Sequence, residues 1–166
     1  MSSNKRLLII YHAPSENTAR LADSLLNAAS LISSNNLTAS DSSDYTLTVI
    51  KKAALEASAD DALNADAIIL MTPENLGYMS GGMKDFFDRV YYPCLEEKQG
   101  LPIAAIIRAG QDGTGTKRAL ETITTGLKWR WVQAPLVLRG EWQDKFLIQA
   151  EELAEAMAVA LQQGMI

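Results

Sequence analysis

Three short, uninterrupted apolar runs constrain the fold of this chain more than any other feature. They are LLII at 7–10, AIILM at 67–71 and IAAII at 103–107. A strand with one exposed face alternates apolar and polar residues, whereas a strand covered on both faces is apolar throughout. The runs therefore predict three central strands of a parallel sheet.

Four segments between and after these runs carry apolar residues at helical spacing. The helical stripes are Leu21, Ala22, Leu25, Leu26, Ala29 and Ile32; Met83, Phe86, Phe87, Val90 and Tyr91; Leu120, Ile123 and Leu127; and Phe146, Ala150, Leu153, Ala154, Met157 and Leu161. Alternating strands and helices predict a parallel sheet with helices on both faces. The Ser-, Asn- and Asp-rich run at 33–44 predicts a surface loop.

Two further strands have the character of sheet edges. YTLTVI at 45–50 alternates apolar and polar residues, and the strand within 131–138 contains Pro135, which cannot donate to a central ladder. Placing these two strands at the edges gives the order 2-1-3-4-5. The predicted fold class is therefore α/β, a flavodoxin-like three-layer sandwich with a five-stranded parallel sheet.

Size and composition limit the classes of function. The 166 residues predict a single domain over 1–166, and the net charge of -5 argues against a nucleic-acid partner. Cys94 is the only cysteine, which excludes an internal disulfide and favours a reducing compartment. No run is long enough to span a membrane, and the apolar run near the start is too short for a signal peptide. We therefore expect a cytoplasmic protein with no membrane partner.

Ligands of such sheets bind beyond the carboxyl ends of the strands, where the strand order reverses. The segments that follow the three central strands are YHAPSENTARLA at 11–22, TPENLGYMSGGMKDFFDR at 72–89 and RAGQDGTGTKRA at 108–119. The first offers hydroxyls and an amide at a helix start, where an anion is favoured, although a simple helix cap would look the same. The other two are rich in glycine. Three such loops at one edge predict a ligand site there.

In this order and spacing, the three loops resemble the FMN-binding loops of the flavodoxin and NAD(P)H-dependent FMN reductase superfamily. The resemblance covers about residues 6–142, and the middle loop is its most specific part. It implies one noncovalent FMN. The residues that it assigns to the cofactor are Ser15, Asn17 and Thr18 at the phosphate, Pro73, Glu74, Asn75, Leu76, Gly77, Tyr78 and Met79 along the isoalloxazine, and Gly110, Gln111 and Asp112 on its other side.

Because a flavin carries the redox chemistry itself, we expect neither a catalytic side chain nor a metal site. Ser80 is expected to cap the helix after the middle loop. Glu16 departs from the family, whose phosphate loop usually has glycine at that place. Other functions fit poorly: a receiver domain would need acidic residues where Tyr11, His12, Met71 and Thr72 stand, and neither a G-x-x-x-x-G-K-[ST] loop nor a G-x-S-x-G elbow is present.

Two functions remain within the flavoprotein class. An enzyme would pass hydride from NAD(P)H to FMN and on to a quinone or similar small-molecule acceptor. A carrier would exchange electrons with a redox partner protein, and it would present an acidic docking face. The mild charge and the basic residues Lys84, Arg89, Arg108, Lys117 and Arg118 favour the enzyme. A flavin-sensing interaction protein stays open as a third alternative, and the resemblance is compatible with a homo-oligomer.

Overall fold

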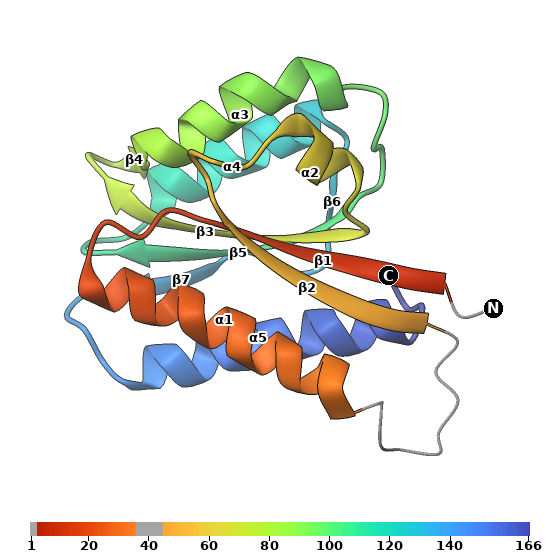
Figure 1. Ribbon diagram of the computed structural model, residues 1–166. Coiled ribbons are helices and arrows are strands. Elements are labelled where there is room, and N and C mark those ends of the chain that lie inside the picture. Colours follow the sequence, from red (N-terminus) through yellow and green to blue (C-terminus); the bar gives the residue numbers. More distant parts are fainter. Residues whose placement is uncertain (1–2, 36–44) are drawn as a thin grey trace.

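A parallel sheet lies between two layers of helices in the computed structural model (Figure 1). The structure describes residues 3–35 and 45–166. In chain order the elements are β1 (Ser3–Tyr11), α1 (Glu16–Asn35), β2 (Tyr45–Ala53), α2 (Ala59–Leu63), β3 (Ala67–Asn75), β4 (Tyr78–Met79), α3 (Gly81–Cys94), β5 (Pro102–Ala109), α4 (Thr114–Gly126), β6 (Arg130–Trp131), β7 (Leu136–Arg139) and α5 (Lys145–Gln162). In Figure 1, α2, α3 and α4 cover the upper face of the sheet, and α1 and α5 cover the lower face.

The strand order confirms the predicted flavodoxin-like topology. The sheet runs β2-β1-β3-β5-β6, and β7 also pairs with β5. These pairs are parallel; among the described strands, only the short β4 is antiparallel to its neighbour β3. The predicted fifth strand is divided into β6 and β7. Pro135 lies in the gap between them, where no ladder needs the N–H that proline lacks.

The two faces of the sheet belong to two different cores. In β1, Leu8 and Ile10 join the core with α3 and α4, whereas Leu7 and Ile9 join the core with α1 and α5. All four side chains are at most 2% exposed. Successive side chains of a strand point to opposite faces, so a strand covered on both sides needs an unbroken apolar run. The prediction of three central strands is confirmed.

The predicted helices are present, with two differences in the connections. The helix α1 continues through Asn35, so the predicted loop at 33–44 is wrong for residues 33–35, while 36–44 lie outside the described residues. The short α2 was not predicted, because its five residues are too few to show a helical stripe. Its start is a local signal, since Ser58 and Asp61 form a reciprocal capping box.

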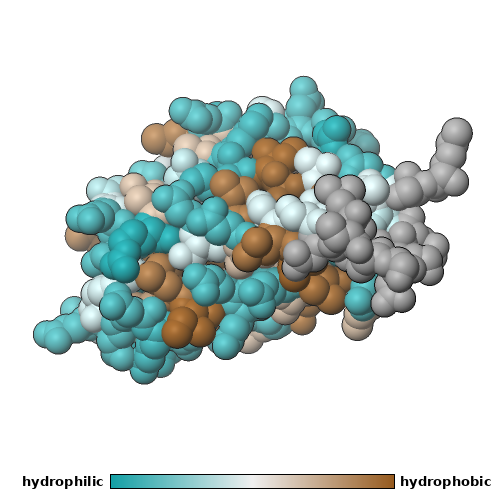
Figure 2. All heavy atoms as spheres, turned by 60° about the horizontal axis from the view of Figure 1, so that its bottom comes forward, coloured by the Kyte–Doolittle hydropathy of each residue, from teal (hydrophilic) through white to brown (hydrophobic). Residues whose placement is uncertain are grey.

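The face formed by α1 and α5 is mixed in character. Figure 2 shows apolar residues on this side interspersed with hydrophilic ones. Exposed apolar side chains here include Leu31 of α1, Ile148 of α5 and Met165 after α5. Among the helices that the structure describes, none is both long enough and apolar enough to cross a membrane.

Candidate functional site

The loops that follow β1, β3 and β5 meet at one edge of the sheet, on the left in Figure 1. Parallel pairing aligns the ends of these strands: Tyr11 is in register with Met71, and Pro73 is in register with Arg108. The first loop joins the second strand directly, because the N–H of His12 donates to the carbonyl of Met71 at 3.0 Å. The three predicted loops therefore form one continuous rim.

Ser15 and Thr18 form a reciprocal cap at the start of α1. The backbone N–H of Thr18 donates to Ser15 Oγ at 3.2 Å, and the N–H of Ser15 donates to Thr18 Oγ1 at 3.0 Å. The two hydroxyl oxygens lie 2.9 Å apart, and Thr18 is only 3% exposed. The hydroxyls that the sequence assigns to a phosphate thus also hold the first turn of the helix.

The same turn keeps donors for an anion. Helix geometry gives the N–H groups of Glu16 and Asn17 no intrahelical acceptor, and the positive end of the helix dipole lies beside them. Asn17 is half-buried, and its Oδ1 is 3.4 Å from Nη1 of Arg20. Glu16 is exposed and is the first residue of α1. It is not among the described non-glycine residues with positive φ, so its backbone conformation does not require glycine.

The glycine-rich middle loop is a tight β-hairpin. Asn75 and Tyr78 face each other across a two-residue turn, and both turn residues, Leu76 and Gly77, have positive φ (53° and 73°). These angles are those of a type I′ turn, the geometry that matches the twist of a hairpin. Residues 75–78 are exposed, so their backbone groups are available to a flat ligand.

A buried hydroxyl network fixes the hairpin to α3. Ser80 Oγ accepts from the N–H of Met83 at 3.2 Å, which confirms the predicted helix cap. Thr72 Oγ1 accepts from the N–H of Ser80 at 3.1 Å, and Thr72 and Ser80 are both fully buried. Pro73 and Met79 are also buried, and the Met79 side chain belongs to the core. Little of either residue is therefore accessible to a ligand in this structure.

The hairpin rests on the first turn of α4. A Cβ at Gly115 would overlap the carbonyl oxygen of Gly77, so the two chain segments approach as closely as glycine allows. Thr116 Oγ1 also donates to Glu74 Oε2 at 3.3 Å. These contacts join the second loop to the third.

The third loop is exposed in its first part and buried at its end, where α4 begins. Gly110, Gln111 and Asp112 are exposed, whereas Gly113 is buried with a φ of +70°. Asp112 Oδ1 accepts from the N–H of Thr114 at 3.0 Å and so supports the start of α4. Asp112 is therefore bound to its own loop by its side chain, and Gly110 and Gln111 are the freer residues at this side of the site.

His12 carries an unsatisfied polar atom at the rim. Its Nδ1 is buried and has no hydrogen-bond partner among the described residues. The other side of the ring packs against Gly82, where a Cβ would lie 2.9 Å from His12 Cδ2. A buried polar atom without a partner is unfavourable, so a ligand or water that satisfied it would be stabilised here.

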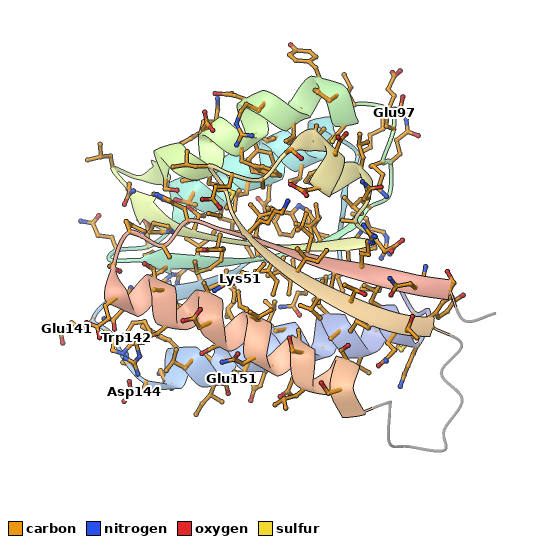
Figure 3. The ribbon with its side chains drawn as sticks, in the orientation of Figure 1. Lys51, Glu97, Glu141, Trp142, Asp144 and Glu151 are labelled. Carbon is orange, nitrogen blue, oxygen red and sulfur yellow. The ribbon has the colours of Figure 1, made fainter. Side chains whose placement is uncertain are left out.

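A fourth loop, after β7, completes the rim and was missed by the sequence analysis. Trp142 lies in this loop, with the guanidinium of Arg20 5.3 Å from its ring centroid. The Arg20 side chain also reaches Asp144, with Nη2 3.5 Å from Oδ1. Figure 3 shows Trp142 and Asp144 beside the start of α1. Arg20 and Asp144 are 124 residues apart, and no local pattern signals such a contact.

Arg108 serves the fold rather than an open site. Its Nη1 donates to the carbonyls of Ala109 (2.6 Å) and Leu138 (3.1 Å), and its Nη2 donates to that of Gly140 (2.6 Å). Burial lowers the pKa of this guanidinium below its ordinary value. Arg108 thus fixes the end of β7 and the start of the fourth loop.

The donors at this edge fit a phosphorylated planar ligand. The α1 terminus offers backbone N–H groups and the exposed Ser15 hydroxyl to an anion, whereas Thr18 Oγ1 donates to the carbonyl of Ser15 at 2.9 Å. The hairpin offers exposed backbone to a ring. By contrast, the described residues contain no group of three or more His, Cys, Asp or Glu side chains that could hold a metal ion. The fold and this edge together define an α/β protein of the flavodoxin-like class.

The family can also be assigned. The family model for NADPH-dependent FMN reductase matches residues 6–144, so the chain belongs to this family and is an FMN-binding redox flavoprotein. No curated protein sequence matches the chain.

Solved structures confirm the flavodoxin-like fold. An archaeal flavodoxin is 17% identical, with a TM-score of 0.71 over 95% of this chain and 99% of its own. A WrbA-like flavodoxin from Agrobacterium tumefaciens is 18% identical, with a TM-score of 0.67 over 96% of this chain and 98% of its own. The flavodiiron protein from Giardia intestinalis is 13% identical, with a TM-score of 0.74, and the match covers 98% of this chain and 38% of that protein.

Proposed function

We propose that this protein is an NAD(P)H-dependent oxidoreductase that passes electrons through FMN to a quinone or similar small-molecule acceptor. Membership of the NADPH-dependent FMN reductase family is the observation that carries this proposal. FMN supplies the hydride and electron transfer when bound. The protein binds it, orients it and limits access to it.

The three predicted loops have separate tasks in this proposal. Ser15, Asn17, Thr18 and the first N–H groups of α1 bind the phosphate. The segment 73–79 borders the isoalloxazine, and Gly110, Gln111 and Asp112 border its other side. The rigid support of the hairpin by Gly115 and by the buried Thr72–Ser80 pair keeps its backbone groups in place.

The charges at the rim support an enzyme more than an electron carrier. A carrier that docks basic proteins would concentrate acidic groups around the flavin. Here the two signs are interspersed: Arg20 lies beside Asp144, and Arg139 Nε donates to the carbonyl of Asp112 at 2.9 Å. Attraction of a basic protein to this rim is correspondingly weak.

The basic residues near the site are less available than their sequence positions imply. Lys84, Arg89 and Lys117 each pair with an acid one helical turn away, and Arg108 is enclosed by carbonyls. Arg118 has no partner among the ion pairs of the described residues, and it lines a groove of about 290 Å³ beside the hairpin. Arg118 is thus a cation available to attract an anionic nucleotide beside the hairpin.

The test is anaerobic reduction of the FMN-loaded protein by NADH and by NADPH, followed by flavin absorbance. The proposal requires bleaching of the flavin within seconds and its recovery when a quinone is added. A loaded protein that dithionite bleaches but that neither nucleotide bleaches would instead be an electron carrier. Arg118→Gln is expected to slow reduction by the nucleotides without changing the FMN content, and Arg130→Gln at the opposite edge is the matched control.

A further inference from the structure

Arg20 reaches from the second turn of α1 toward the first. Its Nη1 lies 3.4 Å from Asn17 Oδ1, and its Nη2 lies 3.5 Å from Asp144 Oδ1. Both distances are at the long limit for a hydrogen bond. The guanidinium is therefore held loosely, next to the helix terminus that receives the phosphate in the proposed function.

The fourth loop gives this cation a rigid support. Trp142 packs edge-to-face on Phe146, with ring centroids 5.7 Å apart, and the guanidinium of Arg108 lies 6.0 Å from the Trp142 centroid. Three backbone carbonyls fix Arg108, so Trp142 packs against a guanidinium that is itself held in place. Its Nε1 also donates to Asp144 Oδ1 at 3.1 Å. The indole thus positions both Arg20 and Asp144.

Asp144 is a weak partner for Arg20. Its side chain is 83% exposed, that of Arg20 is 44% exposed, and ion pairs between such exposed groups contribute little. A phosphate dianion offers the guanidinium two parallel charge-assisted hydrogen bonds, which are shorter and stronger. When phosphate and Asp144 compete for Arg20, the phosphate is favoured.

We propose that Arg20 is a phosphate-binding residue of the FMN site and that Asp144 pairs with the Arg20 guanidinium until FMN binds. The inference rests on the proposed function, which places the FMN phosphate at the start of α1. It also accounts for Glu16. The positive charge of Arg20 at the phosphate offsets the negative charge that Glu16 brings to this loop.

The first test compares FMN with riboflavin, which lacks the phosphate, by isothermal titration of the full chain at low salt. Arg20→Gln should weaken FMN about tenfold, as expected for loss of a charge-assisted hydrogen bond. Riboflavin affinity should change by less than about twofold, because no charged group is lost to it. Arg130→Gln is the matched control, since Arg130 is exposed and lies in register with Pro102 at the start of β5, at the opposite edge. It should leave both affinities unchanged.

The second test asks whether Asp144 acts through Arg20. Asp144→Asn keeps an acceptor for Trp142 but removes the charge, so FMN should bind about three- to fivefold more tightly. In the Arg20→Gln background this gain should largely disappear. Glu141→Gln removes a charge from the same exposed loop and controls for simple repulsion of the phosphate (Figure 3).

Several results would overturn the proposal. Equal weakening of FMN and riboflavin by Arg20→Gln would make Arg20 a support of the loop. An unchanged FMN affinity would remove it from the site. If Asp144→Asn tightened FMN binding equally in the Arg20→Gln background, Asp144 would act only by repelling the phosphate. The two proposals can also fail separately. If Arg20→Gln weakened FMN but not riboflavin, and NAD(P)H failed to reduce the bound flavin, the proposed function would be wrong and this inference would stand. Failure of the wild type to bind either flavin would overturn both.

Discussion

The carboxylate of Glu16 lies in the loop where the FMN phosphate is expected to bind. At the first position of α1 this charge is favourable for the free helix, because it lies at the positive end of the dipole. Beside a dianionic phosphate it becomes unfavourable. Two like charges about 7 Å apart at an effective dielectric near 40 repel by roughly 1 kcal/mol per unit charge, and salt reduces this further.

Glu16→Gln should therefore tighten FMN binding by about 1 to 2 kcal/mol at low salt, and the gain should shrink as salt is added. Titration of FMN at several salt concentrations measures this. Glu97→Gln is the control, because Glu97 is exposed in the connection between α3 and β5, away from the site (Figure 3). An unchanged dissociation constant at low salt would show that the carboxylate points away from the phosphate.

Glycine at this position should tighten FMN binding no more than glutamine does. The described non-glycine residues with positive φ are Leu76, Glu96 and Lys128, so Glu16 is unstrained in its helical conformation. Glu16→Gly also removes the charge, but it is expected to lower helix stability by roughly 0.5 to 1 kcal/mol. The departure from the family pattern is thus one of charge rather than backbone geometry.

Ser80 and Arg20 differ in how far the sequence predicts their contacts. Ser80 was predicted as a helix cap because the signal is local: a serine directly before an amphipathic stripe. The contacts of Arg20 with Trp142 and Asp144 depend on where the end of β7 lies relative to α1, which no local pattern encodes. The assignments of Ser15, Asn17 and Thr18, of residues 73–79 and of residues 110–112 to FMN stay predictions.

At the scale of elements, the hairpin β3–β4 contains a residue that its turn disfavours. Both central positions of a type I′ turn need positive φ, and Asn and Gly are the usual residues there. Leu76 occupies the first of these positions with a φ of 53°, and it is fully exposed. Leu76 therefore gains no burial that could offset the cost of its left-handed backbone conformation.

Leu76→Asn should raise the free energy of unfolding by about 1 kcal/mol, because asparagine adopts the left-handed conformation at lower cost. Urea denaturation of the flavin-free protein measures the change. Leu55→Asn is the matched control: Leu55 is 59% exposed, but it is not among the residues with positive φ. A similar gain in both variants would trace the effect to removal of exposed apolar surface instead of to the turn.

Elements were predictable where burial dictated the sequence. The three central strands and the four long helices follow from apolar periodicity, because each must fill a defined face of a core. The division of the last strand into β6 and β7 was not predicted, although Pro135 indicated an irregularity. The end of α1 was placed too early because its last residues, Ser33, Ser34 and Asn35, favour loops by composition.

At the scale of the whole molecule, the cofactor and the fold are linked. A ligand that binds only the folded state stabilises it by mass action, by about 2.7 kcal/mol when its concentration is 100 times the dissociation constant. In the proposed function the loops after β1, β3 and β5 bind FMN, and the strands before them form the centre of the sheet. Loss of FMN is thus expected to destabilise the molecule as a unit rather than one loop.

Cys94 provides a reporter of this linkage far from the site. It is the only cysteine of the chain, it is 0% exposed, and it ends the 14-residue helix α3, whose first residue follows the rim. At 1.5 Å per residue it lies about 20 Å along the helix from that rim. Burial raises the pKa of its thiol, which lowers the thiolate fraction, so a thiol reagent should react only after the chain opens.

In mild urea, the rate at which a thiol reagent labels Cys94 should therefore fall when FMN is added. If labelling requires global unfolding and refolding is fast, FMN at 100 times its dissociation constant should slow it about 100-fold, because the unfolded population falls by that factor. Riboflavin at the same concentration should protect less, in proportion to its weaker binding. A free cysteine in the same urea controls for the reagent. If FMN left the rate unchanged although titration showed that it binds, Cys94 would become accessible through local opening at the end of α3, which includes Pro93. The far end of α3 would then be uncoupled from the flavin edge of the molecule.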